Sequence, residues 1–315
     1  MGEQMFSWGH QKRYNDLSSY FRSRFGGRIQ KISVDAGFTC PNRDGTKGRG
    51  GCSYCNNRSF SPSYCGIEGN VWAQVTEGIQ FFARKYHAMR YLAFFQSYTN
   101  TYAPVDILRK RFTEALMVEG VIGLVIATRP DCIQEEVLDY LSELNSSCFV
   151  LLELGIESHR DETLESVNRG HTFADSEKAI RIASERGLMT CAHLILGLPG
   201  ETRDDWMDQT AIISRLPVNI IKLHQLQIHR DTKMEAVYRK NPGDFNLFSM
   251  DNYIEILIDY IERLRPSIII DRFVSQAPPE LIIAPAWDIK NFEFVAKVEK
   301  RLAERGTWQG RLWSG

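Results

Sequence analysis

The chain has 315 residues, of which 43% are hydrophobic and 24% charged, the composition of a globular protein that buries a sizeable core. These values exclude a disordered or collagen-like chain. The formal net charge of −1 hides an asymmetry, since residues 1–60 contain ten Lys or Arg and four Asp or Glu, a balance of +6, which leaves −7 for the rest.

The N-terminal segment and the cysteine content bear on the compartment. The segment has no apolar run of the kind found in a secretory signal, and no later stretch has about 18 uncharged apolar residues in succession. Seven cysteines, an odd number, favour reduced thiols, metal ligands or catalysis over a disulfide framework. The sequence therefore predicts a cytoplasmic protein without a membrane span.

The first predicted element is a basic stretch at residues 12–31. Its cations alternate with aromatic residues, the mixture with which proteins contact phosphates and stack on bases. An amphipathic helix lying on the body of the protein would show the same pattern, because solvated basic faces are common. The residues concerned are the cations Lys12, Arg13, Arg22, Arg24, Arg28 and Lys31 and the aromatic residues Tyr14, Tyr20, Phe21 and Phe25.

From residue 28 to residue 226, short β-rich apolar runs alternate with segments of helical period. This alternation is typical of βαβ units with a parallel sheet. The predicted strands are 28–34, 90–95, 123–127, 149–154, 191–196 and 219–226. The predicted helices are 71–86, 104–119, 134–145, 161–168, 173–186 and 204–216. A helix at 250–264, an apolar run at 267–270 and a helix at 291–304 follow as a C-terminal appendage.

Six β/α units are too few for a complete eight-unit barrel. They predict an α/β fold, a partial (β/α)6 TIM-type barrel, with a doubly wound sheet as the alternative. We expect a basic N-terminal extension at 1–27, a core barrel at 28–230 and a helical C-terminal cap at 231–315. In either fold the functional loops follow the C-terminal ends of the strands.

Three cysteines, Cys40, Cys52 and Cys55, follow the first predicted strand. The C-x-x-C pair lets two thiolates converge on one centre, and Cys40 reaches them over a glycine-rich loop. An iron–sulfur cubane held by three thiolates would leave one iron open to a small molecule. Structural zinc would need a fourth ligand, Cys65 or a histidine. Unliganded thiols are the third interpretation. They are also the expected state of the remaining cysteines, Cys65, Cys132, Cys148 and Cys191.

The cysteine spacing and three further motifs resemble the radical S-adenosylmethionine (SAM) superfamily. The motifs are "ATRPDC" (127–132), "LELGIES" with "NRGHT" (152–172) and "HLILGLPGET" (193–202). The first gap of eleven residues departs from the common C-x3-C-x2-C spacing. Such a long gap resembles that of the Elongator catalytic subunit and, most of all, that of the small bacterial YhcC/YtqA-like family. The resemblance covers about residues 28–226.

This resemblance implies two cofactors and the residues that bind them. A [4Fe–4S] cluster would be held by the three cysteines, and SAM would chelate its open iron. Arg169 occupies the place of an arginine that pairs with the SAM carboxylate, a role suited to a bidentate guanidinium. The other SAM-contacting positions that the resemblance implies are Tyr54, Gln96, Ser97, Glu157, His193, Gly197 and Pro199.

The resemblance also implies a reaction and partners. Reductive cleavage of SAM would give a 5′-deoxyadenosyl radical, with an electron donor such as flavodoxin or ferredoxin. The relatives suggest tRNA as substrate, with a wobble uridine side chain as the modified group. The basic residues within the cysteine gap, Arg43, Lys47 and Arg49, are candidates for contacting an anionic substrate. His224 and His229 fall at the rim of the predicted sixth strand. A small metabolite as substrate, and a zinc-stabilised RNA-binding protein without catalysis, are the alternatives.

Overall fold

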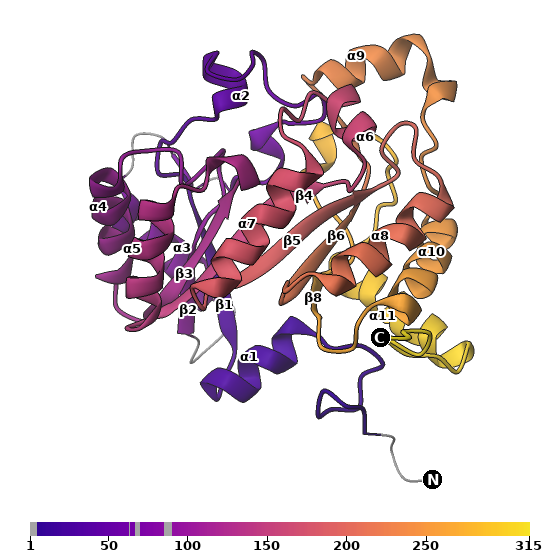
Figure 1. Cartoon of the computed structure of the whole chain (residues 1–315), viewed down its shortest axis with the longest axis horizontal. Helices are drawn as coiled ribbons and strands as arrows, with labels where there is room; N and C mark the ends of the chain where they lie inside the picture. Colours follow the sequence, from indigo (N-terminus) through magenta and orange to yellow (C-terminus); the bar gives the residue numbers. More distant parts are fainter. Residues whose placement is uncertain (1–4, 63, 67–69, 85–89) are drawn as a thin grey trace.

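A computed structural model of the chain describes residues 5–62, 64–66, 70–84 and 90–315. Within these ranges one curved sheet of seven parallel strands forms the centre of the molecule, with strand order β1-β2-β3-β4-β5-β6-β8 (Figure 1). The strands are β1 (Ile29–Val34), β2 (Arg90–Phe95), β3 (Val121–Thr128), β4 (Phe149–Glu157), β5 (Met189–Leu196), β6 (Ile220–Gln225) and β8 (Ile269–Arg272). A small antiparallel pair consists of β7 (Ile228–His229) and β9 (Ile282–Ala284).

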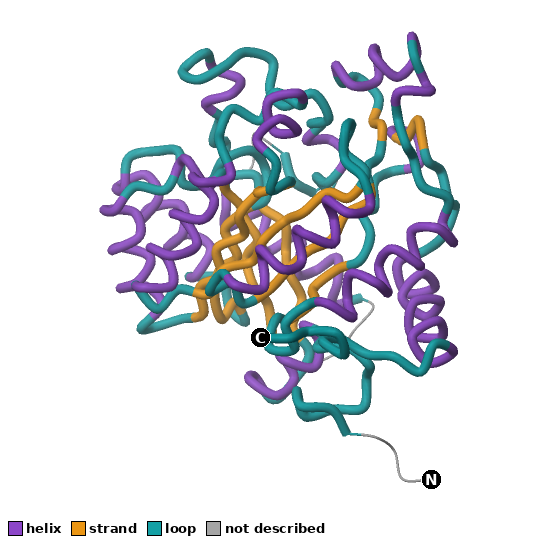
Figure 2. The backbone as a smooth tube through the Cα atoms, turned by 45° about the vertical axis from the view of Figure 1, so that its right-hand side comes forward, coloured by secondary structure: helices purple, strands orange, loops and turns teal. Residues whose placement is uncertain are grey.

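Helices surround the sheet, and most of them follow a strand and pack on the outer face (Figure 2). They are α1 (Leu17–Phe25), α2 (Pro41–Asp44), α3 (Val71–Ala83), α4 (Val105–Leu116), α5 (Glu135–Asn145), α6 (Asp161–Ser166), α7 (Phe173–Glu185), α8 (Arg203–Arg215), α9 (Lys233–Lys240), α10 (Met250–Arg263) and α11 (Asn291–Glu304). Among the residues that the structure describes, no helix has the length and apolar character needed to cross a membrane.

The predicted partial barrel is confirmed, with one strand more than the six expected. The extra strand, β8, contains part of the apolar run that the sequence analysis placed in the C-terminal appendage. Ile269 and Ile270 pair with Ile220 and Ile221 of β6, and all four side chains are buried. The sheet therefore continues past β6 through α10, which supplies the crossover that a parallel connection needs. The end of the predicted helix 71–86 lies outside the described residues.

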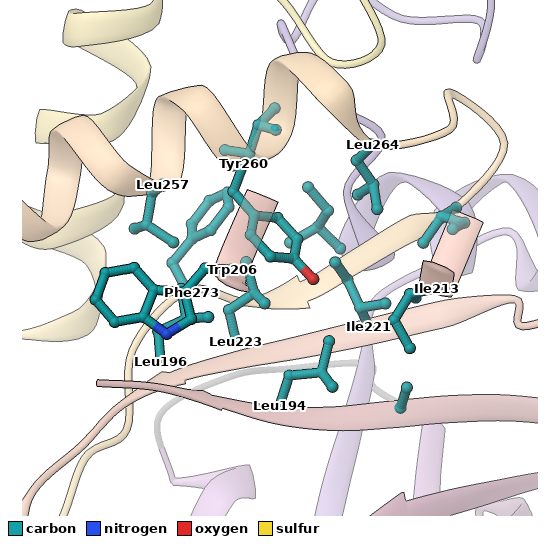
Figure 3. Close-up of a cluster of buried hydrophobic side chains, with 14 of the residues drawn as sticks. Leu194, Leu196, Trp206, Ile213, Ile221, Leu223, Leu257, Tyr260, Leu264 and Phe273 are labelled. Atoms are coloured by element: carbon teal, nitrogen blue, oxygen red, sulfur yellow. The ribbon is translucent and has the colours of Figure 1, made fainter. Parts of the chain in front are cut away.

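The outer face of the sheet packs on α8 and α10. Leu194 of β5 and Leu223 of β6 meet Trp206 of α8 and Tyr260 of α10 in one buried cluster (Figure 3). The predicted helix 250–264 is thus fully part of the main core. Its apolar stripe is needed there because a parallel sheet must be covered on its faces.

The middle of the basic stretch near the N-terminus forms helix α1, which closes the lower end of the half-barrel, and its last residues begin β1, whereas α2 and α9 lie at the upper end (Figure 1). Phe21 and Phe25 meet the ring of Phe149 edge-to-face at centroid distances of 5.9 and 5.4 Å, and Tyr14 is buried. These rings are therefore not available to stack on bases. The alternative interpretation, a helix packed on the body, is correct, and only its cations such as Arg22 face solvent.

Candidate functional site

A cavity of about 240 Å³ opens at the C-terminal ends of the strands, where the fold class places functional loops. Its lining brings together most of the residues expected at a cofactor site: Cys40, Cys52, Tyr54, Cys55, Gln96, Glu157, Arg169 and His193. The predicted rim residues His224 and His229 also line it. Three expected residues, Ser97, Gly197 and Pro199, do not line the cavity.

Residues 40–55, which we call the cysteine loop, are held by the segment that contains "NRGHT". The Ser53 amide donates to the Val167 carbonyl at 2.9 Å, and the Asn168 side chain donates to the Gly51 carbonyl at 2.8 Å. Gly51 has φ +76, a conformation that a side chain would strain. In return the Asn42 side chain donates to the Asn168 carbonyl at 2.5 Å. Two distant stretches of sequence thereby fix each other.

The sulfur atoms of the cysteine loop lie beside hydrogen-bond donors. The Arg169 Nη1 and the Asn42 Nδ2 approach the Cys52 Sγ at 3.5 and 3.6 Å. Burial, together with the nearby Cys52 sulfur, raises the pKa of Cys55 to about 11. Two adjacent thiolates without a bound cation would repel each other here. The sulfur atoms and the neighbouring Arg169 and Asn42 donors therefore fit a site in which a bound cation neutralises the thiolates.

Arg169 enters the cavity wall through a space left by glycine. A Cβ atom on Gly155 would lie 2.5 Å from the Arg169 Nη2 and 2.7 Å from the Glu157 Oε1. A β-bulge in β4 at this point turns Glu157 inward with φ 70, an uncommon conformation for a residue other than glycine. Arg169 pairs with Glu157 at 3.5 Å and donates to the Gly155 carbonyl, while its buried Nε has no partner in the described residues. An unpaired buried donor is available for a ligand.

Arg129, to which the sequence analysis assigned no role, also lines the cavity and holds the Arg169 backbone in place. Its Nη1 donates to the Arg169 carbonyl at 2.7 Å, and its Nε and Nη2 hold the two oxygens of Asp131 at 2.9 and 3.0 Å. Lys47 reaches the same carboxylate at 2.5 Å. Lys47 is therefore engaged within the protein, whereas Arg43 lines the cavity and Arg49 is exposed.

This pairing predicts an acid-sensitive contribution to stability. Arg129 and Lys47 hold the pKa of Asp131 to about 2, below its value in an unfolded chain. The folded protein thus binds fewer protons than the unfolded one, so the contribution is complete above about pH 5 and is lost as the pH falls toward 2. In urea unfolding, the stability advantage of the wild type over Asp131→Asn should narrow steadily from about pH 5 to about pH 3. A pH-independent difference would contradict this assignment.

Below the cavity lies a layer of buried charges from four strands. The Lys222 Nζ donates to Glu153 at 2.5 Å, and Lys31 bonds Glu153 at 3.0 Å and Asp271 at 2.7 Å. The two lysines hold the pKa values of both carboxyl groups below their ordinary range, although burial acts in the opposite direction. Because β1 and β8 are the two edges of the sheet, the Lys31–Asp271 pair joins the edges of the half-barrel.

His193 completes this layer and faces the cavity. Its Nε2 lies 2.9 Å from Glu153, and its ring stacks on that of His224 with centroids 5.7 Å apart. Glu153, His193 and Cys191 together offer three potential metal ligands within 4.8 Å of one another. Two lysine ammonium groups already bond to the Glu153 carboxylate, so this group of residues is an ion-pair cluster in its present form.

The sequence carried a signal for this layer that the sequence analysis did not use. Glu153 and Lys222 each stand within an apolar strand, "FVLLELGIE" and "IIKLHQ". A charge in a strand that is buried on both faces must be paired, because burying an isolated ion is very unfavourable. Opposite charges on different predicted strands therefore indicate contacts in the barrel interior.

Cys65 does not join the other three cysteines. It is not among the residues that line the cavity, and its Sγ donates to the Ser33 carbonyl at 3.1 Å. Burial raises the pKa of this thiol to about 12. Cys65, one of the two kinds of fourth ligand that the zinc interpretation offered, is thus directed elsewhere. Cys132 and Cys191 are buried and Cys148 is partly buried, as expected for thiols without a ligand role.

Comparison with known proteins agrees with this geometry. The model of the radical SAM superfamily matches residues 42–209, and the model described as the radical SAM C-terminal domain matches residues 218–304. The chain is 35% identical over 303 residues to the uncharacterized protein YtqA of Bacillus subtilis, covering 96% of this chain and 94% of YtqA. Protein YhcC of Escherichia coli is 34% identical over 308 residues, with 96% and 97% covered.

Two more distant likenesses concern proteins of the Elongator type. A tRNA uridine(34) acetyltransferase of Methanocaldococcus jannaschii is 25% identical over 165 residues, which are 51% of this chain and 29% of that protein. The solved structure of archaeal Elp3 from Methanocaldococcus infernus superposes with a TM-score of 0.68 at 16% identity, covering 89% of this chain and 64% of that one, and so shares the fold. The full-length likeness to YtqA and YhcC and the family match over residues 42–209 show that the chain belongs to the radical SAM superfamily.

Proposed function

We propose that the cavity above the sheet is the reaction chamber of a radical SAM enzyme and that Cys40, Cys52 and Cys55 hold its cluster. Members of this family carry a [4Fe–4S] cluster and SAM, which together supply a 5′-deoxyadenosyl radical that abstracts a hydrogen atom. The observation that carries the assignment is the cysteine loop, whose three cysteines line one cavity beside the donors of Arg169 and Asn42. The walls of the chamber exclude water from the reactive species.

The unpaired groups of the cavity support SAM contacts by the residues expected from the sequence. Arg169 has a free Nε, and the buried hydroxyl of Tyr54 has no partner among the described residues. We assign Arg169 to the SAM carboxylate and Tyr54 to its adenine, with Gln96 and Glu157 beside them. Ser97, Gly197 and Pro199 do not line the cavity, so we assign them no SAM contact. His193 belongs to the charged layer beneath.

For the substrate we propose tRNA, with a wobble uridine side chain as the modified group. The similarity to a tRNA uridine(34) acetyltransferase over half of this chain supports it. So do the exposed cations Arg43 and Arg49 of the cysteine loop and Lys233 of α9 at the upper end of the barrel. Lys233 lies against the loop, since its Nζ donates to the Arg49 carbonyl at 3.2 Å. A positive surface around the chamber suits a polyanion.

This proposal predicts tRNA binding that weakens steeply with salt. Charge reversal by Arg49→Glu should lower the affinity for tRNA and reduce the slope of log affinity against log salt by about one, the value for one lost phosphate contact. The matched control is Arg22→Glu, which changes an exposed cation at the opposite end of the barrel and should leave both quantities unchanged. Filter binding at several salt concentrations measures them.

Absence of tRNA binding at low salt would refute the tRNA proposal and favour a small metabolite. The modified position is found by comparing the tRNA nucleosides of cells with and without the gene. We also propose a cytoplasmic setting, where tRNA and a reductant such as flavodoxin or ferredoxin occur together.

A further inference from the structure

The end of β8 carries a β-bulge, like the one in β4, and this bulge directs the Arg272 side chain into the cavity. Ile270 pairs with Ile221 and Arg272 pairs with Lys222, so Asp271 is an extra residue without a partner on β6. Neighbouring residues of a regular strand point to opposite faces. Here both Asp271 and Arg272 lie on the inner side, since Asp271 bonds Lys31 within the barrel and Arg272 lines the cavity. Bulges re-aim side chains in this way beside functional sites.

The charges around Arg272 leave it without a counterion. Lys31 and Lys222 are balanced by Glu153 and Asp271, and both lysines lie within 3.4 Å of the Asp271 carboxylate. In the described part of the chain, Arg272 has neither a hydrogen bond nor a carboxylate within 4.0 Å. Its position on a cavity wall, partly shielded from water, makes this unpaired charge unfavourable until an anion binds.

Two neutral groups that line the same cavity also lack partners. His224 Nε2 and Gln227 Oε1 are buried, line the cavity and have no hydrogen-bond partner in the described residues. Gln227 is only 8% exposed. Burial, together with the neighbouring His193 and Arg272, lowers the pKa of His224 well below its ordinary value, so its ring adds no charge of its own. Unsatisfied buried polar atoms in a cavity are groups that a ligand completes.

We propose that Arg272, together with His224 and Gln227 of the same cavity, forms a substrate subsite for an oxyanion, either a carboxylate or a phosphate. Arg272 supplies the charge and a planar set of donors, and the two neutral side chains orient the rest of the substrate. The subsite rests on the proposed use of this cavity as the reaction chamber and is independent of tRNA as the substrate. It is separate from the SAM contacts, which we assign to Arg169 on the cysteine-loop side of the cavity.

The test uses the anaerobically reconstituted protein with SAM bound. Inorganic phosphate and acetate are titrated separately against chloride at constant ionic strength, and binding is followed by the nuclear magnetic resonance signals of the two anions. The wild type should bind at least one of them, and Arg272→Gln should weaken that binding about tenfold or more, as expected for a lost charge-assisted hydrogen bond. Arg272→Lys should retain most of it, and the distant control Arg22→Gln all of it.

The two probes distinguish the sources of the oxyanion. A preference for phosphate indicates a nucleotide phosphate, and a preference for acetate indicates a carboxylic acid. Equal binding by the wild type and Arg272→Gln, or no binding by either, would overturn the subsite. So would a loss of SAM affinity in Arg272→Gln as large as in Arg169→Gln, because Arg272 would then belong to the cofactor. Failure of tRNA binding leaves these outcomes unaffected.

Discussion

Replacement of Cys55 by alanine should abolish 5′-deoxyadenosine formation while leaving the fold intact. Of the three cysteines proposed as ligands, Cys55 lies in the cavity wall beside Cys52, and its loss leaves two thiolates, too few to retain the cluster. We expect iron and sulfide to fall toward background and product formation to fall by more than about a hundredfold, the upper range for loss of even an outer-shell partner of a metal ligand. Anaerobic reconstitution with SAM and a reductant measures both.

Cys148→Ala is the matched control for this experiment. Cys148 is a partly buried thiol whose Sγ donates to the Leu144 carbonyl, far from the cavity lining. Its iron content and product yield should equal those of the wild type. Full activity of Cys55→Ala would refute the ligand assignment, and one zinc per chain in place of iron would refute the cluster.

Among the substitutions proposed for this protein, replacement of Glu153 by glutamine should cause the largest loss in the free energy of unfolding. Glu153 is 1% exposed and accepts hydrogen bonds from Lys222 and Lys31. Its neutralisation leaves two buried ammonium groups with Asp271 as their one carboxylate partner among the described residues. Removing one member of a buried ion pair typically costs about 3–5 kcal/mol. Urea unfolding should report a loss of that size, with an unchanged dependence on denaturant.

Two further variants show whether the loss comes from the unpaired ammonium. Glu153→Gln combined with Lys222→Met removes one excess cation together with the carboxylate, and it should recover a substantial part of the lost stability. Glu165→Gln, an exposed residue of α6, should stay within about 0.5 kcal/mol of the wild type. A single variant as stable as the wild type would contradict the ion-pair description.

Local pattern was sufficient for much of the fold. The six strands and the helices that follow them are visible because hydrophobic periodicity is a property of neighbouring residues. The cysteine loop was also predictable, since its ligand spacing and glycines lie within sixteen residues and its position after the first strand follows from the fold class. Arg169, Tyr54 and Glu157 were expected from the family resemblance that such local motifs carry, and all three line the cavity.

Only the tertiary structure decided which side chains complete the cavity and its floor. The Lys31–Asp271 pair joins residues 240 positions apart, a contact that depends on the sheet curving until its edge strands meet. The orientation of Arg272 was likewise outside the sequence pattern, because strict alternation would place it opposite Asp271, and a bulge against β6 places both on the inner side. Local periodicity is set by bonded geometry, whereas the pairing of buried charges and the register of β8 depend on how distant strands pack together.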